Sequence, residues 1–352
     1  MDAKPPLLEV RDLKKHFPVR KGLFGRSTES VKAVDGVSFQ IGVGETLALV
    51  GESGCGKSTT GRLIMRSHAA TEGEIILRDE GRVWPLHALS SQEQRPVRRK
   101  IQMVFQDPFS ALSPRMTVFD IISEPLVLNG FGSRWEREKR VQELVDLVGL
   151  SRQHLSRYPH AFSGGQRQRI GIARALALSP KLVVADEPVS SLDVSVQAQI
   201  LNLLKDLQRH LNLSYLFISH DLRVVDHLSS RVAVMYAGRL VETGPTQATF
   251  AEPRHPYTSL LVGSIPSPVP GAAVSDVDLA GEVPDLTHPP SGCAFHPRCR
   301  HATDICKTQR PELRAAAGLN DQPRWVACHH AETFDLPGAK SQAIERGSID
   351  VH

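Results

Sequence analysis

The sequence predicts an α/β fold with a largely parallel sheet, followed by a small C-terminal extension rich in cysteine and proline. From about residue 7 to 250, short apolar runs alternate with helical patterns, as in a parallel sheet whose strands are joined by helices. The runs are apolar on both faces, which is typical of strands covered by helices on two sides. They are Thr46–Val50, Lys181–Asp186, Ser214–Ser219 and Arg231–Tyr236. Four of the five cysteines lie within 36 residues near the end, and 12 of the 24 prolines fall in the last 102 residues.

Composition divides the chain into three parts. Residues 1–250 form the predicted α/β domain, and residues 251–331 form the extension, which contains the four clustered cysteines. Residues 264–276 read SIPSPVPGAAVSD, a proline-broken stretch typical of a linker or of a chain that runs extended over a surface. Residues 332–352 show no periodicity, and we expect a flexible tail there.

A helical subdomain is predicted within the α/β domain at about residues 107–180, where the strand signal disappears. Apolar residues in this stretch follow the i, i+3, i+4, i+7 spacing of an amphipathic helix. They are Val141, Leu144, Val145 and Val148. We therefore expect an insertion of helices into the α/β domain.

Charge and hydropathy exclude several classes of protein. The chain has 352 residues with 42 Lys+Arg against 38 Asp+Glu, and its net charge of +4 comes from interspersed residues of both signs. A nucleic-acid-binding face concentrates basic side chains, so no nucleic-acid partner is expected. The longest apolar stretches run to about six residues, far below the roughly 20 of a membrane-spanning helix. The N-terminus lacks the apolar core of a signal peptide, so we expect a cytoplasmic protein whose cysteines are thiols or metal ligands.

A phosphate-binding loop is predicted directly after the first apolar run. Residues 51–59 read GESGCGKST, which matches G-x-x-x-x-G-K-[ST] between a strand and a helix. The glycines let backbone N–H groups and the helix N-terminus face a phosphate chain. Lys57 supplies a charge for the β and γ phosphates of ATP, Ser58 offers a hydroxyl to Mg²⁺, and Thr59 adds a phosphate contact. The residues expected to bind the nucleotide here are Gly51, Glu52, Ser53, Gly54, Cys55, Gly56, Lys57, Ser58 and Thr59, with Cys55 only a small loop residue.

A magnesium site needs a carboxylate beside this loop, and the run LVVADEP ends in two acids. Asp186 is predicted to hold Mg²⁺ through water, and Glu187 to orient and deprotonate the water that attacks ATP. A strand that ends in Asp-Glu is a weak signal alone, because ordinary surface turns also have it. Its pairing with the phosphate loop about 129 residues upstream makes the assignment specific.

A second anion-binding geometry is predicted at residues 162–166, which read FSGGQ and precede a helix. Ser163 caps this helix, and the N–H groups of Gly164 and Gly165 face outward with Gln166. One chain hardly needs two phosphate cradles for one nucleotide. We infer that this cradle binds the γ-phosphate held by a second subunit, so that two subunits close head-to-tail over two ATP molecules.

These motifs together resemble the ATP-binding-cassette (ABC) ATPase family in kind and in order. The remaining matches are Gln106 in VFQDP, SSLD at residues 190–193 and ISHD around His220, and the resemblance covers about residues 7–250. It implies an ABC-type P-loop nucleotide-binding domain, with a RecA-like core and a helical subdomain. It further implies that Gln106 senses the γ-phosphate and joins Ser58 and Asp186 at the Mg²⁺ site.

The same resemblance assigns roles to residues outside the two cradles. His220 would contact the γ-phosphate as a catalytic residue, Asp193 would lie in the loop that faces the partner, and Phe17 would stack on adenine. Two positions depart from the commonest family form: Phe162 stands where Leu is usual, and Ser191 where Ala is usual. Neither change removes a polar group from the chemistry.

Beyond the core motifs, the chain resembles the dipeptide/oligopeptide/nickel branch of bacterial ABC importers, and most closely the dipeptide permease ATP-binding subunits. The matching stretches are LKKHFPVRKGLF, KAVDGVSF, RYPHAFSGGQRQR, RHPYTSLL and the four-cysteine segment. The resemblance implies an ATPase on the cytoplasmic face of the bacterial inner membrane that powers dipeptide or oligopeptide uptake. Its partners would be a related second ATPase subunit, two transmembrane permeases and an extracytoplasmic peptide-binding protein. The alternatives are import of nickel or another solute by the same machinery and, more remotely, a soluble ABC ATPase without a transport role.

The clustered cysteines are Cys293, Cys299, Cys306 and Cys328, with the spacing C-x5-C-x6-C-x21-C. This spacing differs from the close pairs of ordinary zinc sites, although His296, His301 and His329 are available as further ligands. The family resemblance implies a [4Fe-4S] cluster in this position, and four thiolates suit one electronically. Zinc and unliganded thiols are the alternatives, and a structural role is expected because no electron-transfer motif is present.

Overall fold

The computed structural model describes residues 5–19, 29–90, 92–107, 111–264, 284–316 and 323–338. Within them, an eight-stranded sheet has the order β11-β12-β10-β9-β3-β8-β7-β6. Its parallel strands are β9 (Arg231–Tyr236), β3 (Thr46–Val50), β8 (Ser214–Ser219), β7 (Leu182–Asp186) and β6 (Ile101–Val104). The four apolar runs expected as strands are confirmed. A second sheet is antiparallel, with the order β2-β1-β4-β5: β2 (Ser30–Ile41), β1 (Leu8–Pro18), β4 (Glu72–Asp79) and β5 (Arg82–Pro85).

Residues alternate along β3 between two hydrophobic cores, which explains why the run is apolar on both faces. Leu47 and Leu49 pack in a core with the antiparallel sheet and helix α1 (Lys57–Ile64). Ala48 and Val50 pack in a core with the helices on the other face. These are α7 (Val194–Leu211), α8 (Leu222–Leu228) and those of the helical subdomain, while η1 (Leu86–Ala88) and α2 (Gln94–Lys100) connect β5 to β6.

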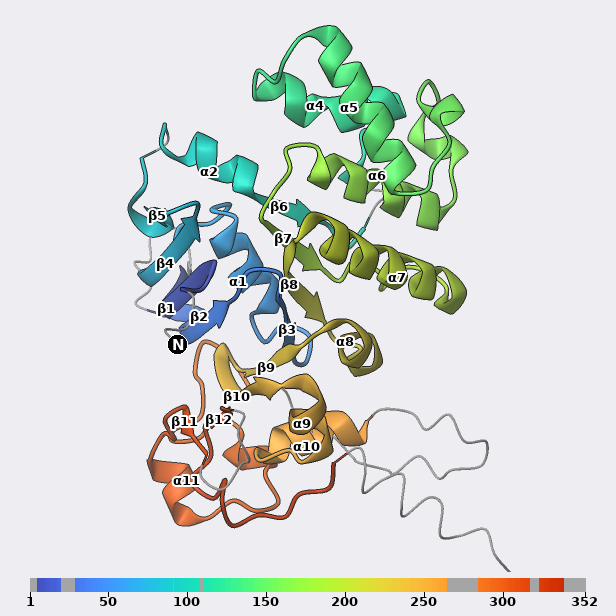
Figure 1. Ribbon diagram of the computed structural model, residues 1–352. Coiled ribbons are helices and arrows are strands. Elements are labelled where there is room, and N and C mark those ends of the chain that lie inside the picture. The colour runs from blue at the N-terminus through green and yellow to red at the C-terminus, as the bar shows by residue number, and fades with distance from the viewer. Residues whose placement is uncertain are drawn as a thin grey trace, which may run out of the picture.

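The helical insertion is present and lies at one end of the molecule, away from the C-terminal elements (Figure 1). It comprises α4 (Val118–Leu128), α5 (Arg134–Leu147), α6 (Gly164–Leu176) and two short turns, η2 (Arg152–His154) and η3 (Pro159–Ala161). The four residues with helical spacing, Val141, Leu144, Val145 and Val148, are all buried. Capping boxes begin α4 at Thr117 and α5 at Ser133, so local side-chain hydrogen bonds fix where each helix starts.

The C-terminal part of the described chain joins the main sheet. After β10 (Arg239–Pro245) come α9 (Thr246–Ala251), α10 (Pro256–Gly263), η4 (His296–Arg298) and α11 (Asp304–Thr308). The strands β11 (Arg314–Ala315) and β12 (Trp325–Val326) follow, and β12 pairs antiparallel with β10. Tyr257, Val262 and Phe295 belong to the same core as Ala48 and Val50. Residues on both sides of the change in composition near residue 251 therefore pack in one hydrophobic core.

A buried ion pair anchors this C-terminal part. Nη2 of Arg324 lies 2.8 Å from Oε1 of Glu242, and the two side chains are 3% and 0% exposed. The Glu242 carboxylate also accepts the backbone N–H groups of Arg254 and His255. The buried charge is thus hydrogen-bonded on several sides, as a charge in a low-dielectric interior requires.

The stretch for which we expected a flexible tail begins with packed residues. Leu336 is buried, and the Ser259 hydroxyl donates to the Pro337 carbonyl over 2.7 Å. The rest of that stretch, residues 339–352, and residues 265–276 of the expected linker lie outside the described residues. No helix of the described chain is long and apolar enough to cross a membrane.

Candidate nucleotide-binding site

The phosphate loop joins β3 to α1, and its glycines have structural reasons to be glycine. Gly51 has φ 148°, and a Cβ there would lie 2.1 Å from the Met235 carbonyl oxygen. Gly56 caps α1 with φ 108°, and a Cβ there would lie 2.1 Å from the Ala33 oxygen. Any side chain at either position would clash with backbone and require a strained φ. The backbone of the loop is therefore wound as tightly as a phosphate cradle requires.

The ammonium of Lys57 holds the two ends of the loop together. Nζ donates to the carbonyl oxygens of Gly51 and Glu52, each over 2.8 Å. The side chain is buried, so these carbonyls replace the water that the charge would otherwise keep. The charge therefore lies within the loop that is to receive a phosphate chain.

Ser58 and Asp186 meet as the sequence predicts for a Mg²⁺ site. The Ser58 hydroxyl donates to Oδ1 of Asp186 over 2.9 Å, across the gap between α1 and the end of β7. Burial raises the pKa of the Asp186 carboxyl, which the Ser58 hydrogen bond opposes and the neighbouring charge of Glu187 reinforces. A hydroxyl and a poorly solvated carboxylate are hard oxygen donors, and a divalent cation would relieve this burial penalty.

Glu187 is held between Gln106 and His220. Nε2 of Gln106 donates to Oε2 of Glu187 over 2.8 Å, and Nδ1 of His220 lies 3.0 Å from Oε1. The backbone of Glu187 has φ 47°, and its N–H donates to the Ile218 carbonyl. Both carboxylate oxygens are thus oriented, which is the arrangement a general base needs.

Several of these residues line one cavity of about 450 Å³ at the phosphate loop. Its lining is Ala33, Ser53, Gly54, Gly56, Lys57, Ser58, Thr59, Gln106, Glu187 and His220. Gly51, Glu52, Cys55 and Asp186 are absent from this lining, although the bonds above tie Gly51, Glu52 and Asp186 to residues that form it. Cys55 is buried in the core beneath the loop, and burial raises its thiol pKa, in keeping with a packing role.

The adenine-stacking role of Phe17 stays a prediction. Its ring lies edge-on to His68, with 5.8 Å between ring centroids, and Nζ of Lys15 lies 4.9 Å from its centroid. Phe17 is not among the residues that line the cavity. No adenine position follows from these contacts.

The signature residues lie at the start of α6 and do not line this cavity. Ser163 and Gln166 form a capping box, in which each side chain accepts the other's backbone N–H. A Cβ on Gly165 would lie 2.4 Å from Cγ1 of Val196, so this glycine permits close packing of α6 on α7. Asp193 caps α7 without a side-chain cap hydrogen bond and is exposed. Contact of these residues with a partner subunit stays a prediction.

The expected [4Fe-4S] cluster is not supported by the arrangement of its ligands. No three Cys, His, Asp or Glu side chains in the described ranges form a metal-binding group, although all four clustered cysteines are described. The thiols do lie in one region: burial, with neighbouring thiols adding to it, raises the pKa of Cys293 to about 11 and that of Cys328 to about 12. A zinc site is not supported either, because the three histidines considered as zinc ligands contact other groups. His296 and His329 meet the carbonyls of Cys293 and Gln309, and His301 packs on Phe334.

Two residues that contact the phosphate loop were not identified from the sequence. The Tyr257 hydroxyl accepts the backbone N–H of Glu52, and Arg298 forms an ion pair with the Glu52 carboxylate. Both come from the C-terminal part of the chain. Tyr257 lies in the RHPYTSLL stretch and Arg298 lies next to Cys299, so family-specific segments were the available signal.

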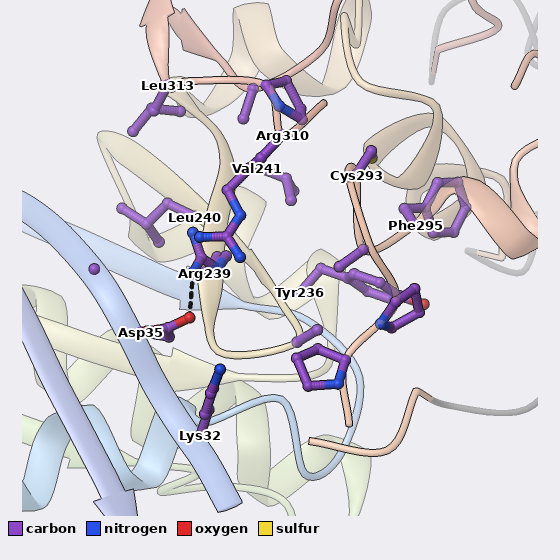
Figure 2. Close-up of a pocket in the computed structure, with 18 of the residues that line it drawn as sticks. Lys32, Asp35, Tyr236, Arg239, Leu240, Val241, Cys293, Phe295, Arg310 and Leu313 are labelled. Carbon is purple, nitrogen blue, oxygen red and sulfur yellow. Dashed lines mark hydrogen bonds and ion pairs between the residues drawn. The ribbon is translucent and has the colours of Figure 1, made fainter. Parts of the chain in front are cut away.

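We call the described residues beyond 250 the C-terminal segment. A second cavity, of about 230 Å³, lies between this segment and the β9–β10 hairpin, apart from the phosphate loop. Figure 2 shows Arg239 paired with Asp35 at its wall, and the side chain of Arg310 extends toward this pair. Apolar side chains such as Leu240, Phe295 and Leu313 complete it.

Comparisons with known proteins show which families the chain resembles. A family model described as "ABC transporter" matches residues 34–190, and one described as "Oligopeptide/dipeptide transporter, C-terminal region" matches residues 241–306. The chain is 51% identical to the oligopeptide transport ATP-binding protein AppF of Bacillus subtilis, over 92% of this chain and 97% of AppF. It is 48% identical to the dipeptide transport ATP-binding protein DppF of Escherichia coli, over 94% and 96%.

A solved structure supports the same placement. The ATP-binding cassette MJ0796, described as a dimer in a post-hydrolysis state bound to ADP and Pi, aligns with a TM-score of 0.59 and 29% identity. The alignment covers 68% of this chain and 98% of MJ0796. One conclusion follows from the shared fold, from the phosphate loop with Asp186 and Glu187 beside it, and from the relatives that match over nearly their whole length. The chain belongs to the ATP-binding subunits of the oligopeptide/dipeptide ABC transporter family.

Proposed function

We propose that this protein hydrolyses ATP to power the import of dipeptides or oligopeptides. The observation that carries the proposal is the position of Glu187, whose two carboxylate oxygens are oriented by Gln106 and His220 at the rim of the phosphate-loop cavity. Membership in the family and the names of AppF and DppF support peptides as the cargo.

The chemistry follows from the arrangement of the residues. Lys57 and the loop N–H groups would hold the β and γ phosphates, and Ser58, Asp186 and Gln106 would hold Mg²⁺, which supplies positive charge to the phosphates. Glu187 would accept the proton of the attacking water, and His220 would keep its carboxylate aimed at that water. Hydrolysis would then depend on closure of the site, which would keep Glu187 and the attacking water in position against the γ-phosphate.

Closure would come from a second ATPase subunit. The signature residues Ser163, Gly164 and Gly165 begin α6 outside the chain's own cavity, and Asp193 is exposed. Both features support a head-to-tail dimer in which these groups complete the partner's site. The partner would be a related ATPase, and mixing differently tagged subunits would test this. Recovery of a homodimer alone in the presence of the related subunit would contradict the heterodimer.

The subunit would dock on two membrane permeases at the cytoplasmic face of the inner membrane, with an extracytoplasmic binding protein delivering the peptide. The decisive experiment is co-purification with the permeases, followed by ATPase assays with the loaded binding protein. Stimulation by a dipeptide or oligopeptide supports the proposal, and stimulation only by nickel or another solute would change the cargo. Failure of any permease to associate would favour an ABC ATPase without a transport role.

A [4Fe-4S] cluster held by Cys293, Cys299, Cys306 and Cys328 stays part of the proposal. It is supported by the family resemblance and by the presence of four thiols, two of which, Cys293 and Cys306, are joined by a backbone hydrogen bond. The described side chains would have to rearrange to bind it, because they form no metal-binding group. Anaerobically purified protein should contain about four irons per chain, and Cys306→Ser should remove them. One zinc per chain, or no metal, would reject the cluster.

A further inference from the structure

The C-terminal segment contacts the phosphate loop at Glu52, which is the single acidic residue of the loop. Nη1 of Arg298 lies 2.8 Å from Oε2 of Glu52, and Nη2 lies 2.9 Å from Oε1, so the guanidinium and the carboxylate meet as a two-bond fork. The side chains are only 4% and 15% exposed. This contact joins residues 246 positions apart in the chain.

Aromatic side chains hold the arginine in place. Its guanidinium carbon lies 5.8 Å from the ring centroid of Tyr236 and 5.9 Å from that of Phe295. The Tyr236 and Phe295 rings meet edge to face with centroids 5.2 Å apart, and Figure 2 shows them on facing segments. A planar cation packed in this way loses little further freedom when it pairs with a carboxylate.

Tyr257 fixes the backbone of the same loop residue. Its hydroxyl oxygen accepts the Glu52 N–H over 2.8 Å, and its ring is fully buried, 4.6 Å from the ring centroid of Tyr236. The Glu52 carbonyl accepts from Lys57. The N–H, the carbonyl and the carboxylate of Glu52 are therefore all hydrogen-bonded, and the partners of the N–H and of the carboxylate lie beyond residue 250.

The turn that carries Arg298 is itself fixed by backbone hydrogen bonds. The N–H of His296 donates to the Cys293 carbonyl, that of Arg298 to Phe295, and that of Cys299 to His296. The guanidinium thus projects from a short, closed turn, η4, rather than from an open loop. A displacement of this turn would reach Glu52 directly.

Two physical consequences follow for a bound nucleotide. A carboxylate without a partner next to the phosphate loop would repel the phosphates of ATP, and Arg298 neutralises it. Release of the Glu52 peptide would also move a carbonyl that holds Lys57, the residue whose charge is meant for the β and γ phosphates. Both effects act on nucleotide binding before any bond is broken.

We propose that Arg298 and Tyr257 are positioning residues for the phosphate loop, through which the C-terminal segment sets the affinity of the protein for MgATP. The inference rests on the proposed ATP site and adds residues that lie outside it. The C-terminal segment then has a role within the ATPase itself, in addition to any role in assembly.

The test measures binding of a fluorescent ATP analogue with Mg²⁺ to the full-length protein, alongside steady-state ATPase assays. Arg298→Ala should weaken binding about 10-fold, because the loop then populates its binding conformation less often. The KM for ATP should rise while kcat changes less than about twofold, the pattern expected when binding energy common to substrate and transition state is lost. Arg300→Ala, which removes an exposed arginine from the same segment, is the matched control and should bind as the wild type.

Further variants separate positioning from general loss of structure. Glu52→Ala combined with Arg298→Ala removes the repelling carboxylate but also lacks the fork, so it should regain only part of the affinity. Arg298→Lys, which keeps the charge but not the fork, should bind with intermediate affinity. Tyr257→Phe keeps the ring and removes the acceptor of the Glu52 N–H, and it should weaken binding about threefold.

Wild-type affinity in Arg298→Ala would overturn the inference, as would full recovery of wild-type affinity in the double variant, because the loop would then need no anchor. Lys57→Ala tests the underlying site. If Lys57→Ala abolishes binding and Arg298→Ala does not weaken it, only the positioning role fails. If Lys57→Ala binds MgATP like the wild type, the proposed ATP site itself fails.

Discussion

Oε1 of Glu187 and Nδ1 of His220 lie 3.0 Å apart, with Glu187 directly after β7 and His220 directly after the adjacent strand β8. Because β7 and β8 are parallel neighbours, their carboxyl ends meet at one edge of the sheet. The contact therefore follows from strand order, and it brings together two residues 33 positions apart.

Glu187→Gln should reduce ATP hydrolysis by at least about 100-fold, because an amide cannot accept the proton of the attacking water. Binding of MgATP should persist, since the phosphate loop and Lys57 are unchanged. Phosphate release assays measure the first effect, and nucleotide-dependent thermal stabilisation measures the second. Turnover near that of the wild type would remove Glu187 from the role of base.

Asp186→Asn should raise the Mg²⁺ concentration that half-saturates ATPase activity by about 10- to 100-fold, as is usual when a group that supports a metal site is changed. The variant keeps the Ser58 hydrogen bond, because the amide oxygen can still accept it. Titration of Mg²⁺ at saturating ATP measures the shift. An unchanged requirement for Mg²⁺ would exclude Asp186 from the metal site.

Stability should fall on mild acidification because of His255. Burial lowers the pKa of this imidazole to about 3, whereas an unfolded chain titrates near its ordinary value of about 6.5. Between about pH 6.5 and pH 3, His255 is protonated in the unfolded state but not in the folded state. The free energy of unfolding therefore decreases by up to about 1.4 kcal/mol per pH unit as the pH falls through this range.

Chemical denaturation between pH 7.5 and 5 measures this slope. His255→Asn is the informative comparison, because Nδ1 of His255 accepts the N–H of Tyr257 at the start of α10, and asparagine can supply an equivalent acceptor. The variant should lose most of the pH dependence. The same slope in both proteins would assign the effect to other groups.

Arg324→Met should destabilise the protein by about 3–5 kcal/mol, because it leaves the charge of Glu242 buried without its ion-pair partner. Adding Glu242→Gln should recover much of the loss. Arg314→Met removes a more exposed arginine that pairs with Glu332, and it should have little effect. Equal losses at Arg324 and Arg314 would show that burial does not govern these pairs.

The sequence predicted those parts of the molecule that depend on local pattern. The strands around β3 were identifiable because both faces are apolar. The phosphate loop was identifiable because its backbone leaves no room for a side chain at Gly51 or Gly56, and because Lys57 stands at the position that its motif requires. The amphipathic spacing that begins at Val141 likewise predicted a helix, and the residues with that spacing form its buried side.

Other features depend on contacts between distant residues and were not predictable in this way. The strand β12 has two residues, too few for any periodicity, and its pairing with β10 is visible only in the folded chain. Arg298 meets Glu52 across 246 positions, and neither residue stands out by type. The four cysteines were assigned to a cluster through the family resemblance, and in the described residues their side chains do not form a metal-binding group.

The pairing of β10 has a consequence for any attempt to isolate the ATPase domain. A chain shortened to residues 1–250 would lack β12, so β10 would become an unprotected edge strand with free backbone N–H and C=O groups. Glu242, on that strand, would lose Arg324 and the N–H groups of Arg254 and His255. Such a fragment would expose an unpaired sheet edge beside a carboxylate without its ion-pair partner. We expect it to aggregate rather than to remain a monomeric domain.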